Sequence, residues 1–334
     1  MSIDFVPLWA ILLGIAVFFY VLLDGFDLGV GILYGLASDG TTRNLIMNSI
    51  APVWDGNETW LVFGGLGLLA AFPLAFSIII PAVYFPILIM LLALAFRGVS
   101  FEFRNRDATH ATLWDYTFCF GSLIATFAQG IVLGAYIQGF KVYGRHFVGS
   151  SFDCFTWFSL FTGLALIFGY ALLGAAWLVL KTEGKLQNTA RQQGRWCFIA
   201  VVIAIGVVSL WTPFSHPEIA HRWFSWPNTA YLLPVPIVTL AIMLFEWWAL
   251  GNESEIAPFI GAIGLFIISY LGIIISLFPM IVPHYFTLWQ AASAPETQIF
   301  LLVGTMFLLP VILMYIGWSY WVFRGKVRAH IGYH

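Results

Sequence analysis

Residues 6–34 read VPLWAILLGIAVFFYVLLDGFDLGVGILY, an apolar run that two aspartates interrupt near its end. A helix needs about 20 apolar residues to cross the core of a lipid bilayer. Eight further apolar runs follow, at residues 50–72, 75–96, 114–139, 155–180, 196–211, 230–250, 256–281 and 298–323. The sequence therefore predicts an all-α integral membrane protein, with about nine transmembrane helices in one polytopic domain over residues 1–334.

The composition points to the same class of protein. Hydrophobic residues make up 61% of the chain and charged residues 9%, whereas soluble domains contain about 25% charged residues. The formal net charge is −2, and the chain has no basic cluster of the kind that binds nucleic acid. We therefore expect contacts with membrane lipid and with partners that are themselves embedded in the lipid.

Basic residues between the apolar runs predict the orientation of the chain. Lys and Arg accumulate on the cytoplasmic side of membrane proteins. If the N-terminus is outside and the C-terminus is cytoplasmic, the inner segments hold eleven of the fourteen basic residues. The outer segments then hold only Lys141, Arg145 and Arg222. The N-out, C-in orientation is therefore predicted.

Nine helices could form two four-helix bundles, at residues 1–140 and 155–281, with a peripheral ninth helix at residues 298–323. A short internal similarity points the same way, because YVLL at residues 20–23 resembles YALL at residues 170–173. The first and fifth runs share one direction, so such units would be parallel repeats.

Two carboxylates lie inside the first apolar run. A charged side chain at the centre of a membrane helix costs about 2.5–3.5 kcal/mol on insertion scales, so Asp24 and Asp27 need a partner or a function. At a rise of about 1.5 Å per residue, Asp24 lies roughly 27 Å from the outer end of the run. The spacing of three residues places both carboxylates on one helical face, where they could line one path or share one cation.

The second and third runs bring more charged residues to the same depth. The second run begins near WDGNETW at residues 54–60, and the third ends at Arg97. The predicted topology thus collects six charged residues at the cytoplasmic third of the first three helices. They are Asp24, Asp27, Asp55, Glu58, Arg97 and Glu102.

This predicted cluster has two interpretations. In one, Asp55 caps a helix N-terminus, where free N–H groups and the helix dipole favour a negative charge, and Arg97 neutralises another carboxylate. In the other, the cluster conducts protons from the cytoplasm, a role for which Asp24 and Glu58 are best suited because they lie deepest. Both roles can coexist at one residue.

The other polar side chains give weaker indications of function. All seven histidines fall in loops or in the C-terminal tail, so no mid-helix histidine could serve as the axial ligand of a haem, and we expect this chain to bind no haem alone. They are His110, His146, His216, His221, His284, His330 and His334. Gln129 and Gln138 are expected to hydrogen-bond across helices. Glu246 could be an interfacial residue.

Three sequence blocks, in order, resemble subunit II of the cytochrome bd-type oxidases. They are DGFDLGVG at residues 24–31, NSIAPVWDGNETW at residues 48–60 and FRGVSFEFR at residues 96–104. The resemblance covers the whole chain in length and in number of apolar runs. Glu58 and Thr59 favour the cyanide-insensitive quinol oxidase branch, because relatives of the enterobacterial type have Gln-Val at these positions.

The resemblance implies a subunit of an electrogenic bacterial inner-membrane complex that couples quinol oxidation to the reduction of oxygen to water. Its haem-bearing subunit I would carry two b-type haems and either a d-type or a third b-type haem. Small accessory subunits and a structural quinone could also be present. Asp24 and Asp55 match acidic positions on a proton route, and Glu102 matches its entrance. Trp54 could pack toward the partner's haem, and a buried cation could lie near Asp24 and Asp27.

Two other functions are compatible with buried carboxylates on glycine-rich helices. A proton-coupled secondary transporter would use the same features and would act without a haem-bearing partner. A structural scaffold for such a partner would need no proton route. Copurification with a haem protein separates the oxidase subunit from the transporter, and substitution of Asp24 and Asp55 separates it from the scaffold.

Overall fold

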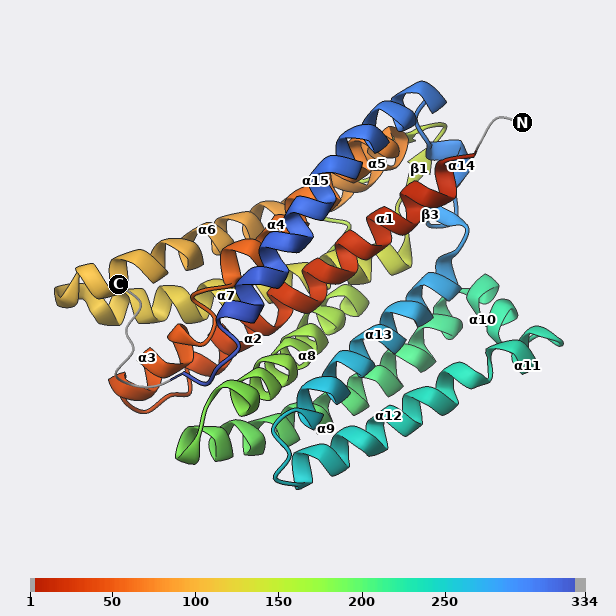
Figure 1. The fold of residues 1–334 in the computed structure, drawn as a ribbon. Coiled ribbons are helices and arrows are strands. Elements are labelled where there is room, and N and C mark those ends of the chain that lie inside the picture. The colour runs from red at the N-terminus through yellow and green to blue at the C-terminus, as the bar shows by residue number, and fades with distance from the viewer. Residues whose placement is uncertain (1–3, 328–334) are drawn as a thin grey trace.

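The computed structural model describes residues 4–327, and its long helices run side by side (Figure 1). The first of them is continuous through α1 (Val6–Phe19), the π-helical segment η1 (Tyr20–Asp24) and α2 (Gly25–Tyr34). The other helices are α3 (Gly40–Asn48), α4 (Trp54–Ala71), α5 (Pro73–Ala82), α6 (Tyr84–Arg106), the 3-10 turn η2 (Ala108–His110), α7 (Ala111–Gln138), α8 (Trp157–Lys181), α9 (Gly184–Ser215), α10 (Pro217–Phe224), α11 (Asn228–Leu232), α12 (Pro234–Gly251), α13 (Ala257–Leu277), α14 (Leu288–Ala291) and α15 (Pro295–Val322). Two short antiparallel hairpins pair β1 (Val142–Tyr143) with β2 (His146–Phe147) and β3 (Met280–Val282) with β4 (Phe286–Thr287).

The all-α membrane class is confirmed, since eight helices within residues 4–327 are long and apolar enough to cross a bilayer. The predicted boundaries of the third helix were wrong. The apolar run at residues 75–96 is divided between α5 and α6, because Pro81 lies in the last turn of α5, which ends at Ala82. Proline lacks the N–H that continues a helix. α4, at 18 residues, is the predicted second helix and does not count among the eight.

The predicted sixth helix was also too short. Instead of 16 residues from Trp196 to Trp211, α9 has 32, because its polar first part continues the helix beyond the apolar run. Arg191 and Arg195 on that part donate to backbone carbonyls at the end of α12, among them the Leu250 oxygen at 3.1 Å from Arg195 Nε. Carbonyls at a helix C-terminus lack partners within the helix. These hydrogen bonds therefore stabilise the helical conformation of the polar part of α9.

Long-range contacts gather several helix ends at one end of the molecule, where the basic residues lie. Lys181 at the end of α8 donates to the carbonyls of Phe323 and Gly325 at the end of α15, at 2.5 and 2.9 Å. Lys326 pairs with Glu255, between α12 and α13. α10, α14 and the β3–β4 hairpin lie at the opposite end (Figure 1). Arg328, another basic residue of the predicted inner side, lies outside the described residues.

The N-out, C-in orientation stays a prediction that reporter fusions can test. A reporter placed after Lys185 should be found in the cytoplasm, and one placed within residues 145–150 should be found outside, because eleven of the fourteen basic residues then lie inside. The reverse pair of results would contradict both the orientation and any proton route that begins in the cytoplasm.

Two glycines allow the backbones of α2 and α8 to touch where the two helices cross. A Cβ added at Gly29 would lie 1.7 Å from the carbonyl oxygen of Tyr170, and one added at Gly174 would lie 2.3 Å from the carbonyl carbon of Gly29. Small residues at such crossings allow close helix packing in membranes. This crossing joins the first helix to the fifth, and it holds Asp24 and Asp27 beside the core of the molecule. The division into two four-helix bundles and a ninth helix stays a prediction.

We expect Gly29→Ala to destabilise the protein by about 3 kcal/mol or more, because the added methyl group meets backbone atoms that cannot move away independently. The measurement is the thermal melting temperature of the purified complex and its yield. Gly206→Ala on α9 is the matched control, since no atom lies within 4 Å of a Cβ added there. Equal melting temperatures for the two variants would contradict the close crossing.

Candidate functional site

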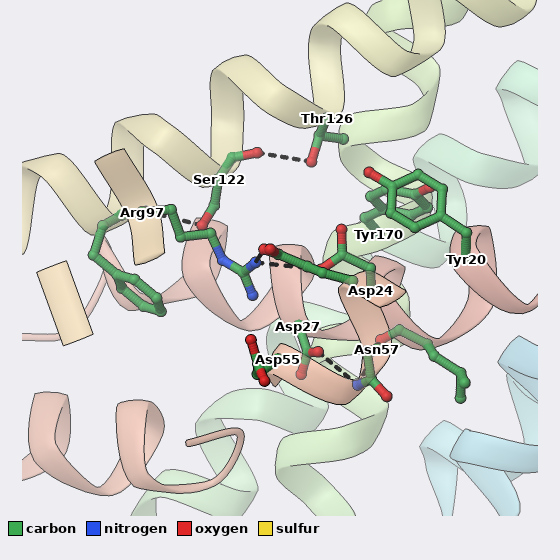
Figure 2. A network of polar contacts seen from close by, with 12 residues as sticks. Tyr20, Asp24, Asp27, Asp55, Asn57, Arg97, Ser122, Thr126 and Tyr170 are labelled. Carbon is green, nitrogen blue, oxygen red and sulfur yellow. Dashed lines mark hydrogen bonds and ion pairs between the residues drawn. The ribbon is translucent and has the colours of Figure 1, made fainter. Parts of the chain in front are cut away.

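A fully buried arginine forms the centre of the polar cluster between the first helix, α4 and α6. Arg97 Nη1 lies 3.2 Å from Asp24 Oδ1 and 2.8 Å from Glu58 Oε1. Figure 2 shows the Arg97 side chain reaching across to Asp24. The Arg97 and Asp24 side chains are 0% and 1% exposed, whereas the Glu58 side chain is 25% exposed. The cluster therefore leads from a partly exposed carboxylate to a buried one through a shared guanidinium.

A second chain of hydrogen bonds begins at Asp27. Asn57 Nδ2 donates to Asp27 Oδ2 at 2.7 Å, as Figure 2 shows, and Tyr320 on α15 donates to Asn57 Oδ1 at 3.0 Å. Tyr320 also lines a cavity of about 150 Å³ at the basic end of the molecule, together with Trp177 and Lys181. A cavity of that size with polar groups in its wall, such as Lys181, can hold several waters. Asp27 thus has its own connection toward the predicted cytoplasmic end.

The rim of this cavity carries a charged pair. Lys326 lines the cavity and donates to Glu255, which also accepts from Gln187 Nε2 at 3.0 Å. These two hydrogen bonds, that of Lys326 first, lower the pKa of the Glu255 carboxyl below its ordinary value. The rim therefore carries an ion pair beside the C-terminal segment.

Asp24 ends a π-helical segment. In η1 (Tyr20–Asp24) the helix departs from the regular α pattern, a feature that is rare and often found at functional sites. Tyr20 and Tyr170 both hydrogen-bond to the side chain of Gln129. Gln129 Nε2 donates to the Tyr20 hydroxyl at 2.7 Å, and the Tyr170 hydroxyl donates to Gln129 Oε1 at 2.8 Å. The two similar segments seen in the sequence thus contact the same glutamine.

The charges in the cluster do not balance when every carboxyl group is ionised. Asp24, Asp27 and Glu58 would then carry three negative charges against the one positive charge of Arg97. Asp24 Oδ2 and Asp27 Oδ1 are buried without a hydrogen-bond partner among the described residues. Burying uncompensated charge is costly. The cluster can therefore hold protons or a cation, and this capacity is what a proton route requires.

The structure brings some predicted residues together and leaves others apart. Asp24, Glu58 and Arg97 are in direct contact, so the prediction that Arg97 neutralises a carboxylate is confirmed. Asp55 is exposed in the first turn of α4, and the capping position belongs to Val53, which makes no side-chain cap. The prediction that Asp55 caps the helix was therefore wrong, although the helix dipole still favours its charge there.

Glu102 was predicted to join the cluster and does not. It lies on the exposed side of α6, where its carboxylate pairs with Arg106 at 3.2 Å. The reason is helical geometry, because Glu102 follows Arg97 by five residues and so points to a different side of the helix. Trp54 is half-buried and stacks on Phe101 with ring centroids 4.8 Å apart.

A second charged group was missed from the sequence. Asp115 on α7 accepts from Arg104 Nε at 2.5 Å, from Arg43 Nη1 at 2.8 Å and from the Tyr34 hydroxyl. It ties the ends of α2, α3 and α6 to the start of α7. The only signal in the sequence was the density of arginines near these helix ends, which also indicates the orientation of the chain.

Three further polar residues were considered from the sequence, namely Gln129, Gln138 and Glu246. Gln129 and Gln138 hydrogen-bond across helices as expected, Gln138 Oε1 accepting from Thr156 Oγ1 at 2.5 Å. Glu246 is fully buried against α13, and neither carboxylate oxygen has a partner among the described residues, while its place at the membrane interface stays a prediction.

The described histidines lie at helix ends, in hairpins and on the short helix α10. Their positions offer no axial ligand from within the spans that the structure describes. They are His110, His146, His216, His221 and His284, while His330 and His334 lie outside the described residues. The polar side chains buried within the described helices include carboxylates, amides, hydroxyls and an arginine.

Comparisons with known proteins identify the family. Residues 6–323 match the family described as cytochrome bd terminal oxidase subunit II. Among curated relatives, the cytochrome bd-I ubiquinol oxidase subunit 2 of Escherichia coli K12 is 26% identical, over 96% of this chain and 94% of that protein. The cytochrome bd ubiquinol oxidase subunit 2 of Bacillus subtilis 168 is 28% identical, over 96% of both chains.

A solved structure shares the fold. A chain of the bd oxidase from Geobacillus thermodenitrificans superimposes with a TM-score of 0.77 at 17% identity, over 96% of this chain and 99% of that one. The family expected from the three sequence blocks is confirmed, while the cyanide-insensitive branch stays a prediction. With its apolar membrane-crossing helices and a family match that spans nearly the whole sequence, the chain is a multi-pass protein of the bacterial inner membrane and belongs to the subunit II family of the cytochrome bd terminal oxidases.

Proposed function

We propose that this chain acts within a quinol:oxygen oxidoreductase, where it supplies a cytoplasmic proton-uptake path and supports a haem-bearing subunit I. The complex takes electrons from quinol and reduces oxygen to water. Relatives named as ubiquinol oxidase subunits support this reaction. Bound haem supplies the electron transfer and the oxygen chemistry, while the residues of this chain bind and move protons.

The observation that carries the proposal is the gradient of exposure across the shared arginine. Glu58 is partly exposed at the edge of the cluster, and Asp24 is buried on the other side of Arg97. Asp55 lies three residues before Glu58 on α4, hence on the same face and closer to the helix start. A proton can pass from Asp55 to Glu58 and then to Asp24. The unpartnered Oδ2 atom of Asp24 is free to hold it.

Arg97 positions the two carboxylates and offsets their charge, so neither is left alone in the membrane interior. The chain from Tyr320 through Asn57 to Asp27 gives a second connection to the same cluster, from the cavity at the basic end. Glu102 stays a proposed entrance from the surface, since it pairs with Arg106 on the exposed side of α6.

Several finer features belong to this proposal. Subunit I holds two b-type haems and either a d-type or a third b-type haem, and Trp54 packs toward one of them at the interface. Accessory subunits, a structural quinone and a cation near Asp24 and Asp27 are further proposed components. The guanidinium of Arg97 already neutralises Asp24, so such a cation would serve Asp27, whose Oδ1 atom has no partner among the described residues.

An optical spectrum of the copurified complex tests the assignment of the haems. We expect reduced-minus-oxidised bands of b-type haem, with or without a d-type band, from the complex. After separation of the subunits in mild detergent, haem should remain with the partner, because the described histidines of this chain lie outside its spans. Stoichiometric haem on this chain after separation would contradict the assignment.

A further inference from the structure

Three metal-binding side chains meet at the end of the molecule opposite to the basic end. His216 follows α9 directly, Glu218 is the second residue of α10, and His284 lies in the turn between β3 and β4. One ligand atom from each of the three lies within 4.8 Å of the other two. His284 Nδ1 pairs with Glu218 Oε1, and the two imidazole rings stack with centroids 5.1 Å apart. Two segments that lie 66 to 68 residues apart in the sequence thus converge on one point.

The ring of His284 is held in place from a third side. A Cβ added at Gly139, the residue that ends α7, would lie 2.6 Å from His284 Cδ2, so the ring packs directly on that glycine. The backbone of His284 has a φ of +69°, in the left-handed region. That conformation is uncommon for residues other than glycine, and strained residues of this kind gather at functional sites.

The short helix α10 is fixed independently of the cluster. Arg222 Nη1 donates to the Ile275 carbonyl at 2.8 Å, and Trp223 Nε1 donates to Ser276 Oγ at 2.9 Å. Both contacts hold α10 against the end of α13, as the placement of α10 in Figure 1 also shows. Glu218 is therefore presented to His284 by a rigid support, and the three ligand groups are arranged before any ion binds.

We propose that His216, Glu218 and His284 bind a divalent transition-metal ion such as Zn²⁺ on the outer face of this subunit. Two imidazoles and one carboxylate form a ligand set that zinc uses, and the remaining coordination position would be left to water. Imidazole ligands favour zinc, copper, nickel and iron over calcium and magnesium, which prefer oxygen. The bound ion would fasten α10 to the β3–β4 hairpin and would satisfy both imidazoles and the carboxylate at once.

Zinc binding to the intact complex tests this site. After treatment with a chelator and desalting, the wild-type complex is titrated with Zn²⁺ by equilibrium dialysis and atomic emission. His284→Asn removes the ligand while asparagine tolerates the left-handed backbone, and we expect it to weaken one zinc site by about 100-fold or more. His221→Ala on α10, an exposed histidine outside the cluster, is the matched control and should bind like wild type. Zinc sites on subunit I contribute equally to all samples and cancel in the difference.

Two outcomes would overturn the proposal. Equal zinc binding by wild type and His284→Asn would show that the three residues form only an ion pair and a ring stack, as would wild-type binding in Glu218→Gln. The Glu218→Gln variant carries the same test if His284→Asn does not assemble, because the Glu218 side chain is 61% exposed and its loss leaves no cavity. Quinol oxidase activity should be unchanged in all these variants, so the result is independent of the proposed proton path.

Discussion

Replacing Arg97 by alanine should destabilise the assembled complex by about 3–5 kcal/mol, the usual cost of leaving buried ionic partners without their counter-charge. Arg97 is fully buried and contacts both Asp24 and Glu58. Without it, two carboxylates remain in the membrane interior with no nearby positive charge. The measurement is the melting temperature and haem content of the purified complex. We expect low yield and early loss of haem.

A second set of variants shows whether the lost charge causes this effect. Adding Asp24→Asn and Glu58→Gln to Arg97→Ala should recover a large part of the stability, because neutral side chains are then buried instead of charges. Arg106→Ala is the control, since its pair with Glu102 is well exposed and such pairs contribute about 0–1 kcal/mol. If the Arg97→Ala and Arg106→Ala complexes had the same melting temperature, the buried ion pair would have no structural role.

Asp24→Asn should slow quinol oxidase turnover by about 100-fold while the haem spectrum persists, because asparagine keeps the shape of the side chain but cannot carry a proton. Glu58→Gln should act in the same direction. The double variant should cost little more than either single one, as expected for residues on one path. Oxygen consumption with excess quinol is the measurement. Asp153→Asn, in the loop before α8, is the matched control.

Asp55→Asn distinguishes a proton carrier from a residue that only favours the helix terminus. In the exposed first turn of α4, asparagine keeps the size of aspartate and loses only a favourable interaction with the helix dipole, about 0.3–1 kcal/mol, so a purely structural Asp55 predicts unchanged turnover. We expect slower turnover, because Asp55 lies on the same face of α4 as Glu58 and nearer to its first turn. It should also be non-additive with Asp24→Asn. Wild-type rates for Asp55→Asn would remove this residue from the path and leave Glu58 as its beginning.

The sequence predicted the fold class well, and it also predicted that Asp24, Glu58 and Arg97 lie close together. Length and hydropathy placed the first helix at Val6–Tyr34, the same bounds that the structure has. The same criteria failed where a helix is interrupted or continues past its apolar run. Pro81 and Val83 divide the third run, and the polar start of α9 stays helical because its arginines bind carbonyls on α12. Such tertiary contacts have no periodic signal.

The site was predicted only in part, because its details also depend on contacts between distant helices. Topology could bring Asp24, Glu58 and Arg97 to one level of the membrane, but it could not say which side of α6 faces the first helix. Glu102 therefore seemed equivalent to Arg97, and its outward direction appeared only in the structure. The π-helical turn at Asp24 and the partnership of Asn57 with Tyr320 also depend on packing between distant helices.

Proton uptake during a single turnover is the most direct test of the path through Glu58 and Asp24. The fully reduced complex is mixed with oxygen in the presence of a pH-indicator dye, and proton uptake is followed beside oxidation of the haems. We predict that Asp24→Asn slows proton uptake by about the same factor as it slows steady turnover, while haem reduction by quinol remains intact. Proton uptake at the wild-type rate in an assembled Asp24→Asn complex would contradict the path and leave this subunit a scaffold for its partner.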